Sequence, residues 1–320
     1  MGKNKEENSV VESKVKKFFL PVLLILLFLS NIFTLIFFIQ KEKIVSGVAE
    51  DQYNLLNPAR HLLQKNDLII NFQPLRDYIN NKYGADLNIS IYFEYLPTGA
   101  NISINKDAEF YPASLLKVPV AMAVAKKIEK GDWQWTNELV LMSTDKDNKF
   151  GTLYKEPTNS THTIEDLARR SLSDSDNSAH FMLVRNLEIE EMKDVYDHMG
   201  LDGFLETEGN LSAKKYSIIF RALYNSSYLT EESSQKLLFY LSHSPFNYYI
   251  QKGLPQNIIF AHKIGVDTDK KIYLDSGIVY VQNRPYILTI LTKNKDEQKA
   301  EEIMEDISKN TYNYVNDYKD

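Results

Sequence analysis

The chain has 320 residues, a formal net charge of −6 and 43% hydrophobic residues. This ordinary globular composition gives no indication of a nucleic-acid partner. It contains no cysteine, which excludes disulfides, thiolate metal sites and a cysteine nucleophile, and its six histidines form no metal-binding cluster. Neither a metal nor a cofactor is therefore expected.

An apolar segment lies near the start of the chain. Residues 18–39 carry no charge, and 22 residues at about 1.5 Å each are long enough to cross a bilayer. Five lysines precede this segment, whereas residues 41–60 hold only Lys41, Lys43 and Arg60, a bias that favours a cytoplasmic N-terminus. A cleaved signal peptide is the alternative. We expect a cytoplasmic tail at 1–17, an uncleaved membrane anchor at 18–40, a linker at 41–65 and an extracytoplasmic domain at 66–320.

A helix and a β-hairpin are expected at the start of that domain. Apolar residues recur at spacings of three and four from Leu68 to Tyr83, which predicts a helix. Strict alternation from Leu87 to Tyr95 predicts a strand, and residues 101–105 follow a Pro-Thr-Gly turn as the second arm of the hairpin.

A buried helix should follow, beginning near Ser114 and ending at Gly131. Residues 113–125 are apolar except for Ser114 and Lys117. These two side chains are three residues apart and so share one helix face. Ser-x-x-Lys occurs six times in the chain, but only this copy places the lysine in an apolar helix. A buried amine beside a serine suggests an activated nucleophile, although a lysine that reaches back to solvent is an alternative.

Helices dominate the centre of the chain and strands return at its end. Residues 132–162 are polar and loop-like. A helix should begin at Thr163, and further helices should span residues 179–187, 190–199, 212–224 and 231–241. Strands are expected at 257–265, 273–281 and 285–292, followed by a helix at 296–318. This order fits an α+β fold, in which one antiparallel sheet is built from both chain ends with helices on both faces.

Two further motifs carry polar groups. Ser175-Asp176-Asn177 lies in a loop between predicted helices, where it could serve only as a turn and N-cap. Lys263-Ile264-Gly265 ends a predicted strand, and the glycine leaves space for a ligand or another backbone on the face that carries Lys263. An edge-strand lysine in solvent is the plain alternative.

In this order, the three motifs resemble those of the class A β-lactamases and penicillin-binding proteins. Phe110-Tyr-Pro-Ala-Ser114 and Thr163-Ile-Glu-Asp-Leu167 also resemble the family, and the similarity covers about residues 66–320. The resemblance implies that Ser114 forms an acyl-enzyme and that Lys117 takes its proton.

The resemblance also implies roles for the remaining motif residues. Ser175 would relay a proton to the leaving nitrogen, and Asn177 would hold Lys117 and bind the substrate amide. Lys263 and Gly265 would line the substrate site. The backbone N–H groups of Ser114 and Val266 would form the oxyanion hole.

Two departures from the family pattern stand out. Ile264 replaces the hydroxyl residue that normally helps to bind the substrate carboxylate. Glu206 and Asn210 fit the spacing of the Glu-x-x-x-Asn motif that holds the deacylating water, but they lie in a loop shorter than the family's. An acidic surface turn is the other interpretation of Glu206.

The expected function is a membrane-anchored, extracytoplasmic serine hydrolase that is acylated at Ser114 and hydrolyses a β-lactam or a related amide. One alternative is a penicillin-binding D-Ala peptidase acting on peptidoglycan, favoured by the short loop and by Ile264. The other is a catalytically inactive homologue that keeps the fold and only binds its ligand.

Overall fold

The computed structural model describes residues 28–32, 53–57, 68–202, 204–206 and 209–319. The chain divides into two units, Met1–Asn54 and Leu55–Asp320. In the described ranges, no helix combines the length and apolar character needed to cross a bilayer. Most of the segment predicted as a membrane anchor lies outside those ranges, and its residues 28–32 are helical.

One five-stranded sheet organises the second unit, and it joins the two ends of the domain as predicted. Its strands are β1 (Ile89–Tyr95), β2 (Ala100–Ile104), β5 (Phe260–Asp267), β6 (Ile272–Val279) and β7 (Tyr286–Lys293). Their order is β2-β1-β7-β6-β5, and all neighbours are antiparallel. The β1–β7 pairing, with Ile91 opposite Ile290, connects the N-terminal hairpin to the C-terminal strands. Strand β5 lies at one edge.

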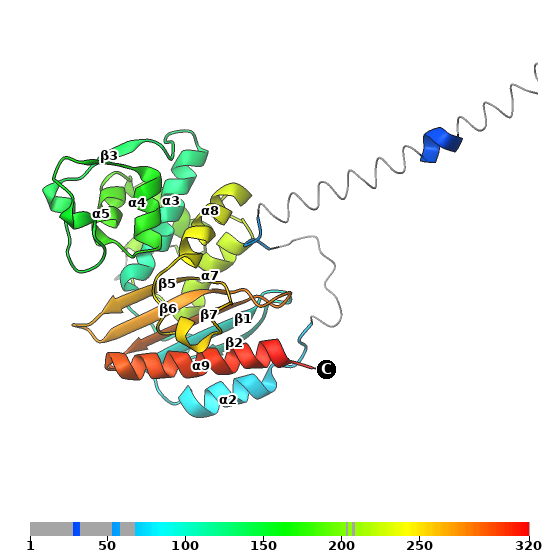
Figure 1. The fold of residues 1–320 in the computed structure, drawn as a ribbon. Helices are drawn as coiled ribbons and strands as arrows, with labels where there is room; N and C mark the ends of the chain where they lie inside the picture. The colour runs from blue at the N-terminus through cyan, green and yellow to red at the C-terminus, as the bar shows by residue number, and fades with distance from the viewer. Residues whose placement is uncertain (1–27, 33–52, 58–67, 203, 207–208, 320) are drawn as a thin grey trace, which may run out of the picture. The chain divides into compact units, whose positions relative to one another are not determined.

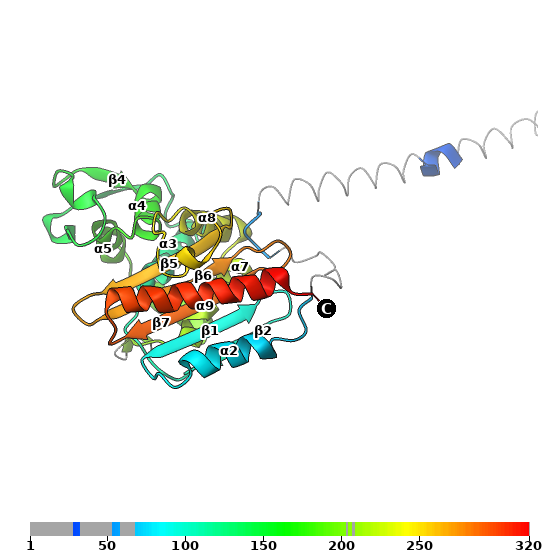
Figure 2. The same ribbon diagram turned by 60° about the horizontal axis from the view of Figure 1, so that its bottom comes forward.

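Two helices cover one face of the sheet. Helices α2 (Gln73–Tyr83) and α9 (Glu297–Asp317) lie side by side on this face (Figures 1 and 2). The predicted start of this helix at Leu68 is wrong, because α2 begins at Gln73. Pro74 favours this later start, since a proline in the first turn of a helix costs no hydrogen bond, whereas inside the helix its missing N–H would. Leu75, Ile79 and Ile303 pack with the strands into the larger hydrophobic core.

The other face carries the α-helices of residues 117–242 in the second unit, α3 to α8. Helix α7 (Ala213–Tyr224) packs on β1, β6 and β7, and α8 (Glu231–Ser242) packs on β5. The helices α3 (Lys117–Glu129), α4 (Ile164–Leu172), α5 (Asn177–Arg185) and α6 (Ile189–His198) complete this lobe. A second cluster, which includes Val124, Leu167 and Leu183, forms its core.

The stretch predicted to be loop-like, residues 132–162, contains regular structure. A two-stranded sheet pairs β3 (Glu138–Val140) with β4 (Thr161–Thr163), and the short 3₁₀ helices η3 (Ser143–Asp145) and η4 (Leu153–Lys155) lie between them. Strands of three residues are too short to show the alternation by which strands are recognised.

Part of the predicted linker packs against the domain. Leu55 and Leu56 are buried. The Leu55 backbone N–H donates to Gln235 Oε1 at 3.0 Å, and its carbonyl accepts from the Tyr280 hydroxyl at 2.8 Å. The Asn57 N–H donates to the Tyr224 carbonyl at the end of α7. Residues 55–57 therefore belong structurally to the domain.

Candidate functional site

Ser114 lies in a short 3₁₀ helix that leads into α3. This helix, η2, spans Ala113–Leu116, and α3 begins at Lys117, so the predicted single helix starts with a tighter turn. Ala113 has a φ of +45°, in the left-handed region that alanine rarely adopts. Tyr216 of α7 donates to the Leu115 carbonyl at 2.8 Å and holds this turn in place. Ser114 itself is partly exposed.

The edge strand β5 lies directly against the η2 turn. A Cβ at Gly265 would come within 2.9 Å of the Pro112 carbonyl oxygen and 3.2 Å of the Leu115 side chain. The space that the sequence predicted beside Lys263 is thus occupied by another backbone. Glycine at this position lets β5 approach the turn that carries Ser114.

Lys117 joins η2 to the Ser175-Asp176-Asn177 loop. Its side chain is only 2% exposed. Its Nζ donates to the Ser175 carbonyl oxygen at 2.5 Å, to Asn177 Oδ1 at 2.6 Å and to Ser175 Oγ at 3.2 Å. The prediction that Lys117 is buried is therefore confirmed.

Burial lowers the pKa of Lys117 to about 7, and the carboxylates of Asp176 and Asp147 oppose this shift. Near neutral pH a large fraction of the amine is therefore unprotonated. A neutral amine donates two hydrogen bonds and accepts one. Because a carbonyl oxygen cannot donate, bonds to Ser175 O and Asn177 Oδ1 leave the lone pair for a hydroxyl group.

The loop that receives Lys117 is strained and tightly held. Ser175 is 1% exposed and has a φ of +56°. Asp176 caps α5 through the Ala179 N–H, and its other oxygen accepts from the N–H groups of Thr152 and Leu153 at 2.7 and 2.8 Å. These three bonds keep Ser175 and Asn177 turned toward Lys117.

Lys263 is buried on the same side of the sheet as Gly265. It is 1% exposed, and its Nζ lies 5.8 Å from the ring centroid of Phe246. Burial and the nearby Lys117 ammonium lower the pKa of Lys263, whereas Asp275 and Asp174 raise it. Lys263 is therefore not a solvated edge-strand lysine.

Ile264 points to the opposite face of β5. It belongs to the hydrophobic core that includes α9, as strand alternation requires. Val266 lies on the same face and packs partly against that core. The departure at Ile264 thus places an apolar side chain under α9 instead of beside Ser114.

The Glu206–Asn210 segment is only partly described. The turn η5 (Phe204–Glu206) is held by the Phe204 ring, 4.4 Å from the Tyr196 ring. The Glu206 side chain lies outside the described residues, so its predicted role is untested. Asn210 is partly buried and precedes Leu211, whose backbone pairs with Phe110 near Ser114.

Two polar side chains beside the cluster were not predicted. Asp147 Oδ1 accepts from Asn177 Nδ2 at 2.8 Å, across 30 residues of sequence that give no local signal. His180 lies one turn after Asn177 on α5, a spacing that could have indicated it. Its buried Nδ1 has no partner among the described residues, and burial, with Lys117 and Lys263, lowers its pKa to about 3.

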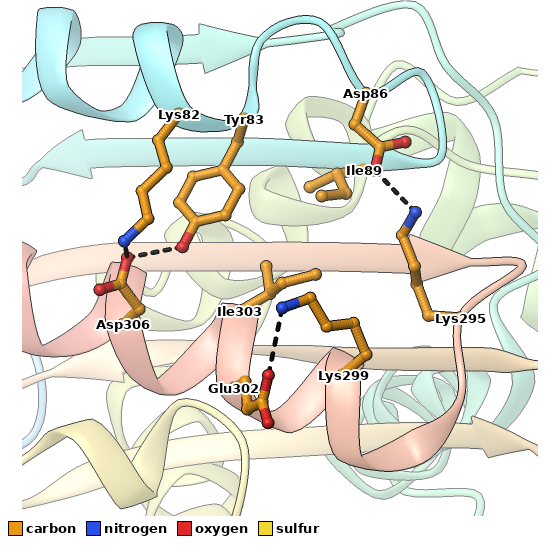
Figure 3. A pocket seen from close by; sticks show the side chains of 9 residues that line it. All are labelled: Lys82, Tyr83, Asp86, Ile89, Lys295, Lys299, Glu302, Ile303 and Asp306. Atoms are coloured by element: carbon orange, nitrogen blue, oxygen red, sulfur yellow. Dashed lines mark hydrogen bonds and ion pairs between the residues drawn. The ribbon is translucent and has the colours of Figure 1, made fainter.

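A separate cavity of about 490 Å³ lies between α2 and α9 (Figure 3). Asp306 accepts from Lys82 and Tyr83 there, at 2.9 and 2.5 Å. The cavity's other two lysines pair with Asp86 and Glu302, as the dashed lines show. Each ammonium group has a carboxylate partner, which neutralises the cavity, and the Lys82–Asp306 pair joins α2 to α9. Near Lys117, by contrast, burial outweighs the neighbouring carboxylates.

The α+β fold and the hydrogen-bonded cluster of Lys117, Ser175 and Asn177 beside the turn that carries Ser114 fit a serine hydrolase of the β-lactamase type. The model of one protein family, described as the Beta-lactamase enzyme family, matches residues 73–315. The chain belongs to this family and is a serine hydrolase of the class A β-lactamase type.

Known relatives and structures support this assignment. Beta-lactamase VEB-1 of Pseudomonas aeruginosa is 24% identical over 243 residues, which cover 67% of this chain and 80% of the relative. The structure of PBP-A is similar with a TM-score of 0.69 at 21% identity, covering 77% of this chain and 97% of PBP-A. A β-lactamase from Sphaerobacter thermophilus gives 0.69 at 21% identity, covering 78% and 100%. At these identities the solved structures establish the fold alone.

Gly265→Ala should disrupt the site with a modest loss of stability. The new Cβ must displace the Pro112 carbonyl, which moves the η2 turn and Ser114. We expect the second-order rate constant of Ser114 acylation to fall by at least tenfold and the free energy of unfolding to fall by about 1–3 kcal/mol. Gly99→Ala is the control for a loss of stability without displacement of the η2 turn, because its Cβ would meet nothing within 4 Å while its positive φ adds backbone strain. Unchanged acylation in Gly265→Ala would show that β5 does not position Ser114.

Proposed function

We propose that this protein forms an acyl-enzyme at Ser114 with a β-lactam or a related amide, using Lys117 as the base. The observation that carries the proposal is the environment of Lys117. The side chain is buried, its pKa is lowered to about 7, and two carbonyl-type oxygens fix its donors. These conditions suit a general base that works near neutral pH.

The proposed chemistry uses Ser114 together with Lys117 and Ser175, which are in contact with each other. Ser114 Oγ attacks the carbonyl carbon while its proton passes to Lys117 Nζ. As the C–N bond breaks, the leaving nitrogen receives a proton from Ser175 Oγ, which recovers one from Lys117. The contact between Lys117 Nζ and Ser175 Oγ supports this route. The acyl group remains on Ser114 as an ester.

Backbone donors are proposed to stabilise the developing oxyanion. The N–H groups in the first turn of a helix lack intrahelical partners, which makes the Ser114 N–H a suitable donor. Val266 lies on β5, an edge strand with one unpaired row of backbone groups. Each such donor typically contributes about 3–4 kcal/mol to the transition state. Asn177 and Lys263 are proposed to bind the substrate amide and carboxylate.

The first test is a covalent adduct. The full-length protein, mixed with benzylpenicillin and with a chromogenic cephalosporin, should gain the mass of the opened lactam on the peptide that contains Ser114. Ser114→Ala should lose the adduct and the colour change completely, and Ser143→Ala, in another Ser-x-x-Lys copy, should retain both. Adduct formation in Ser114→Ala would refute the assigned nucleophile. Failure of the wild-type protein to react with any lactam would favour the homologue that only binds.

Deacylation distinguishes two functions. In a β-lactamase, Glu206 would activate the water that hydrolyses the acyl-enzyme, with Asn210 helping to hold it. In a D-Ala peptidase of the penicillin-binding type, the lactam ester would persist. The short connection between α6 and α7, residues 199–212, favours this second candidate. A similar structure, of a PBP-A mutant, is described as an acyl-enzyme complex with penicillin-G, which supports this candidate.

Glu206→Gln should separate the two functions. If Glu206 is the deacylating base, the steady-state turnover of the lactam should fall by about 10²–10³-fold while acyl-enzyme accumulates. Glu208→Gln, in the same loop, is the matched control and should keep wild-type turnover. Equal turnover in wild-type protein and Glu206→Gln would remove Glu206 from the mechanism and favour the peptidase.

We further propose that residues 18–40 anchor the protein in the membrane with the catalytic domain outside. The uncharged segment and the lysine bias support this proposal. In expressing cells the full-length protein should stay in the membrane pellet after a carbonate wash. Leu24→Arg combined with Leu27→Arg should release it or block export, because each arginine at the centre of a span costs about 2.5–3.5 kcal/mol. Wild-type protein in the soluble fraction would contradict the anchor.

A further inference from the structure

The segment 145–153 wraps around the start of α5. The Asp147 N–H donates to Ser178 Oγ at 2.9 Å, and the Asn177 N–H donates to the Phe150 carbonyl at 3.1 Å. Gly151 has a φ of +87°, and a Cβ there would lie 2.1 Å from the Asp176 carboxylate. These contacts fix the segment against the Ser175-Asp176-Asn177 loop and leave Asp147 little freedom to move.

The Asp147 carboxylate fixes the orientation of the Asn177 amide. Its Oδ1 accepts from Asn177 Nδ2 at 2.8 Å and from the Lys149 N–H at 2.9 Å. A carboxylate only accepts hydrogen bonds, so the NH₂ group of Asn177 must face Asp147. The amide oxygen then faces Lys117 Nζ, at 2.6 Å. The three side chains form one continuous hydrogen-bonded chain.

We propose that Asp147 is a positioning residue for the acylation reaction, acting through Asn177 on the amine of Lys117. This proposal rests on the proposed function, in which Lys117 takes the proton of Ser114. Asp147 would have two effects. It would hold the Asn177 amide oxygen that orients the Lys117 amine, and its negative charge would raise the pKa of that amine.

The charges around Lys117 come from three directions. On the α5 side, Asp176 raises the pKa of Lys117. The Lys117 charge in turn lowers the pKa of His180. On β5, Lys263 is the like charge, and its own pKa is lowered by Lys117. The third direction is the 145–153 segment.

Within that segment Asp147 is the carboxylate that acts on Lys117. It also raises the pKa of Lys117. Asp145 instead pairs with Arg185 at 2.9 Å. Asp147 therefore opposes the effect of burial on the pKa of Lys117 and helps to keep that pKa close to 7.

Two substitutions separate the two effects. Asp147→Asn keeps an oxygen acceptor for Asn177 but removes the charge. Asp147→Ala removes both. Asp132→Asn makes the same charge change just beyond the far end of α3, roughly 20 Å along the helix from Lys117, where ionic screening is nearly complete. It serves as the matched control.

The acid limb of the pH profile of acylation should show the effect of the Asp147 charge on the pKa of Lys117. Removing a carboxylate lowers the pKa of Lys117, so in Asp147→Asn the acid limb of the acylation rate should move down by about one pH unit. At pH 6 the variant should therefore acylate about fivefold faster than wild type, with a similar plateau at high pH. Asp147→Ala should show the same shift together with a plateau lowered by roughly tenfold, because the Asn177 amide is no longer held. Asp132→Asn should overlay wild type.

A direct titration of Lys117 makes the test independent of acylation. The full-length protein carrying ¹³C-labelled lysine should show a lysine titrating near pH 7 that Lys117→Arg removes, which distinguishes it from Lys263, whose pKa is also lowered. Asp147→Asn should move this transition to lower pH by the same amount as the acid limb. If the titration and the acid limb both stay at their wild-type positions in Asp147→Asn, the proposal is overturned. If wild-type protein forms no acyl-enzyme at all, the proposed function fails, and the Lys117 titration still decides whether Asp147 sets its charge.

Discussion

The structure depends above all on one ammonium group held out of water. An isolated buried charge is strongly unfavourable, so Lys117 must find partners inside the protein or lose its proton. The partners come from Ser175 and Asn177, roughly 60 residues further along the chain. Their alignment requires α3, α5 and the loop before α5 to keep one fixed arrangement. A buried lysine thus imposes order on three elements while its own pKa is brought near neutrality.

The same arrangement explains where the backbone is strained. Ala113 and Ser175 both adopt positive φ; Ala113 directly precedes Ser114, and Ser175 accepts hydrogen bonds from Lys117. Such conformations cost about 1–3 kcal/mol each and persist only where surrounding contacts hold them. Tyr216 holds the turn at Ser114, and the three N–H bonds to Asp176 hold the loop at Ser175. Stability elsewhere in the domain therefore supports the geometry of the site.

Sequence reasoning reached the parts of this site that leave a local pattern. A lysine in an apolar helix is conspicuous, and alternating strands at both chain ends predicted the sheet that the structure confirms. Asp147 could not be found in this way, because its hydrogen bond with Asn177 depends on the fold that brings the two residues together. The same holds for the contact between Gly265 and Pro112, since the sequence indicated space but not what fills it. The β3–β4 pair was missed because its strands are too short to alternate.

Strand geometry also bears on the substitution at Ile264. Neighbouring residues of a strand point to opposite faces, so a position that follows Lys263 can be apolar without entering the Ser114 side of the sheet. Here Ile264 adds to the core under α9. Lys263 and Ser175 lie on the Ser114 side of the sheet.

Recognition of a substrate carboxylate would then rely on the buried ammonium group of Lys263 more than on a hydroxyl group at position 264. Because burial and the Lys117 charge lower the pKa of Lys263, an anionic ligand that stabilises its protonated form would raise that pKa as it binds. In the proposed function, Ile264 would therefore alter how a carboxylate is bound, while the charge proposed to attract it remains on Lys263.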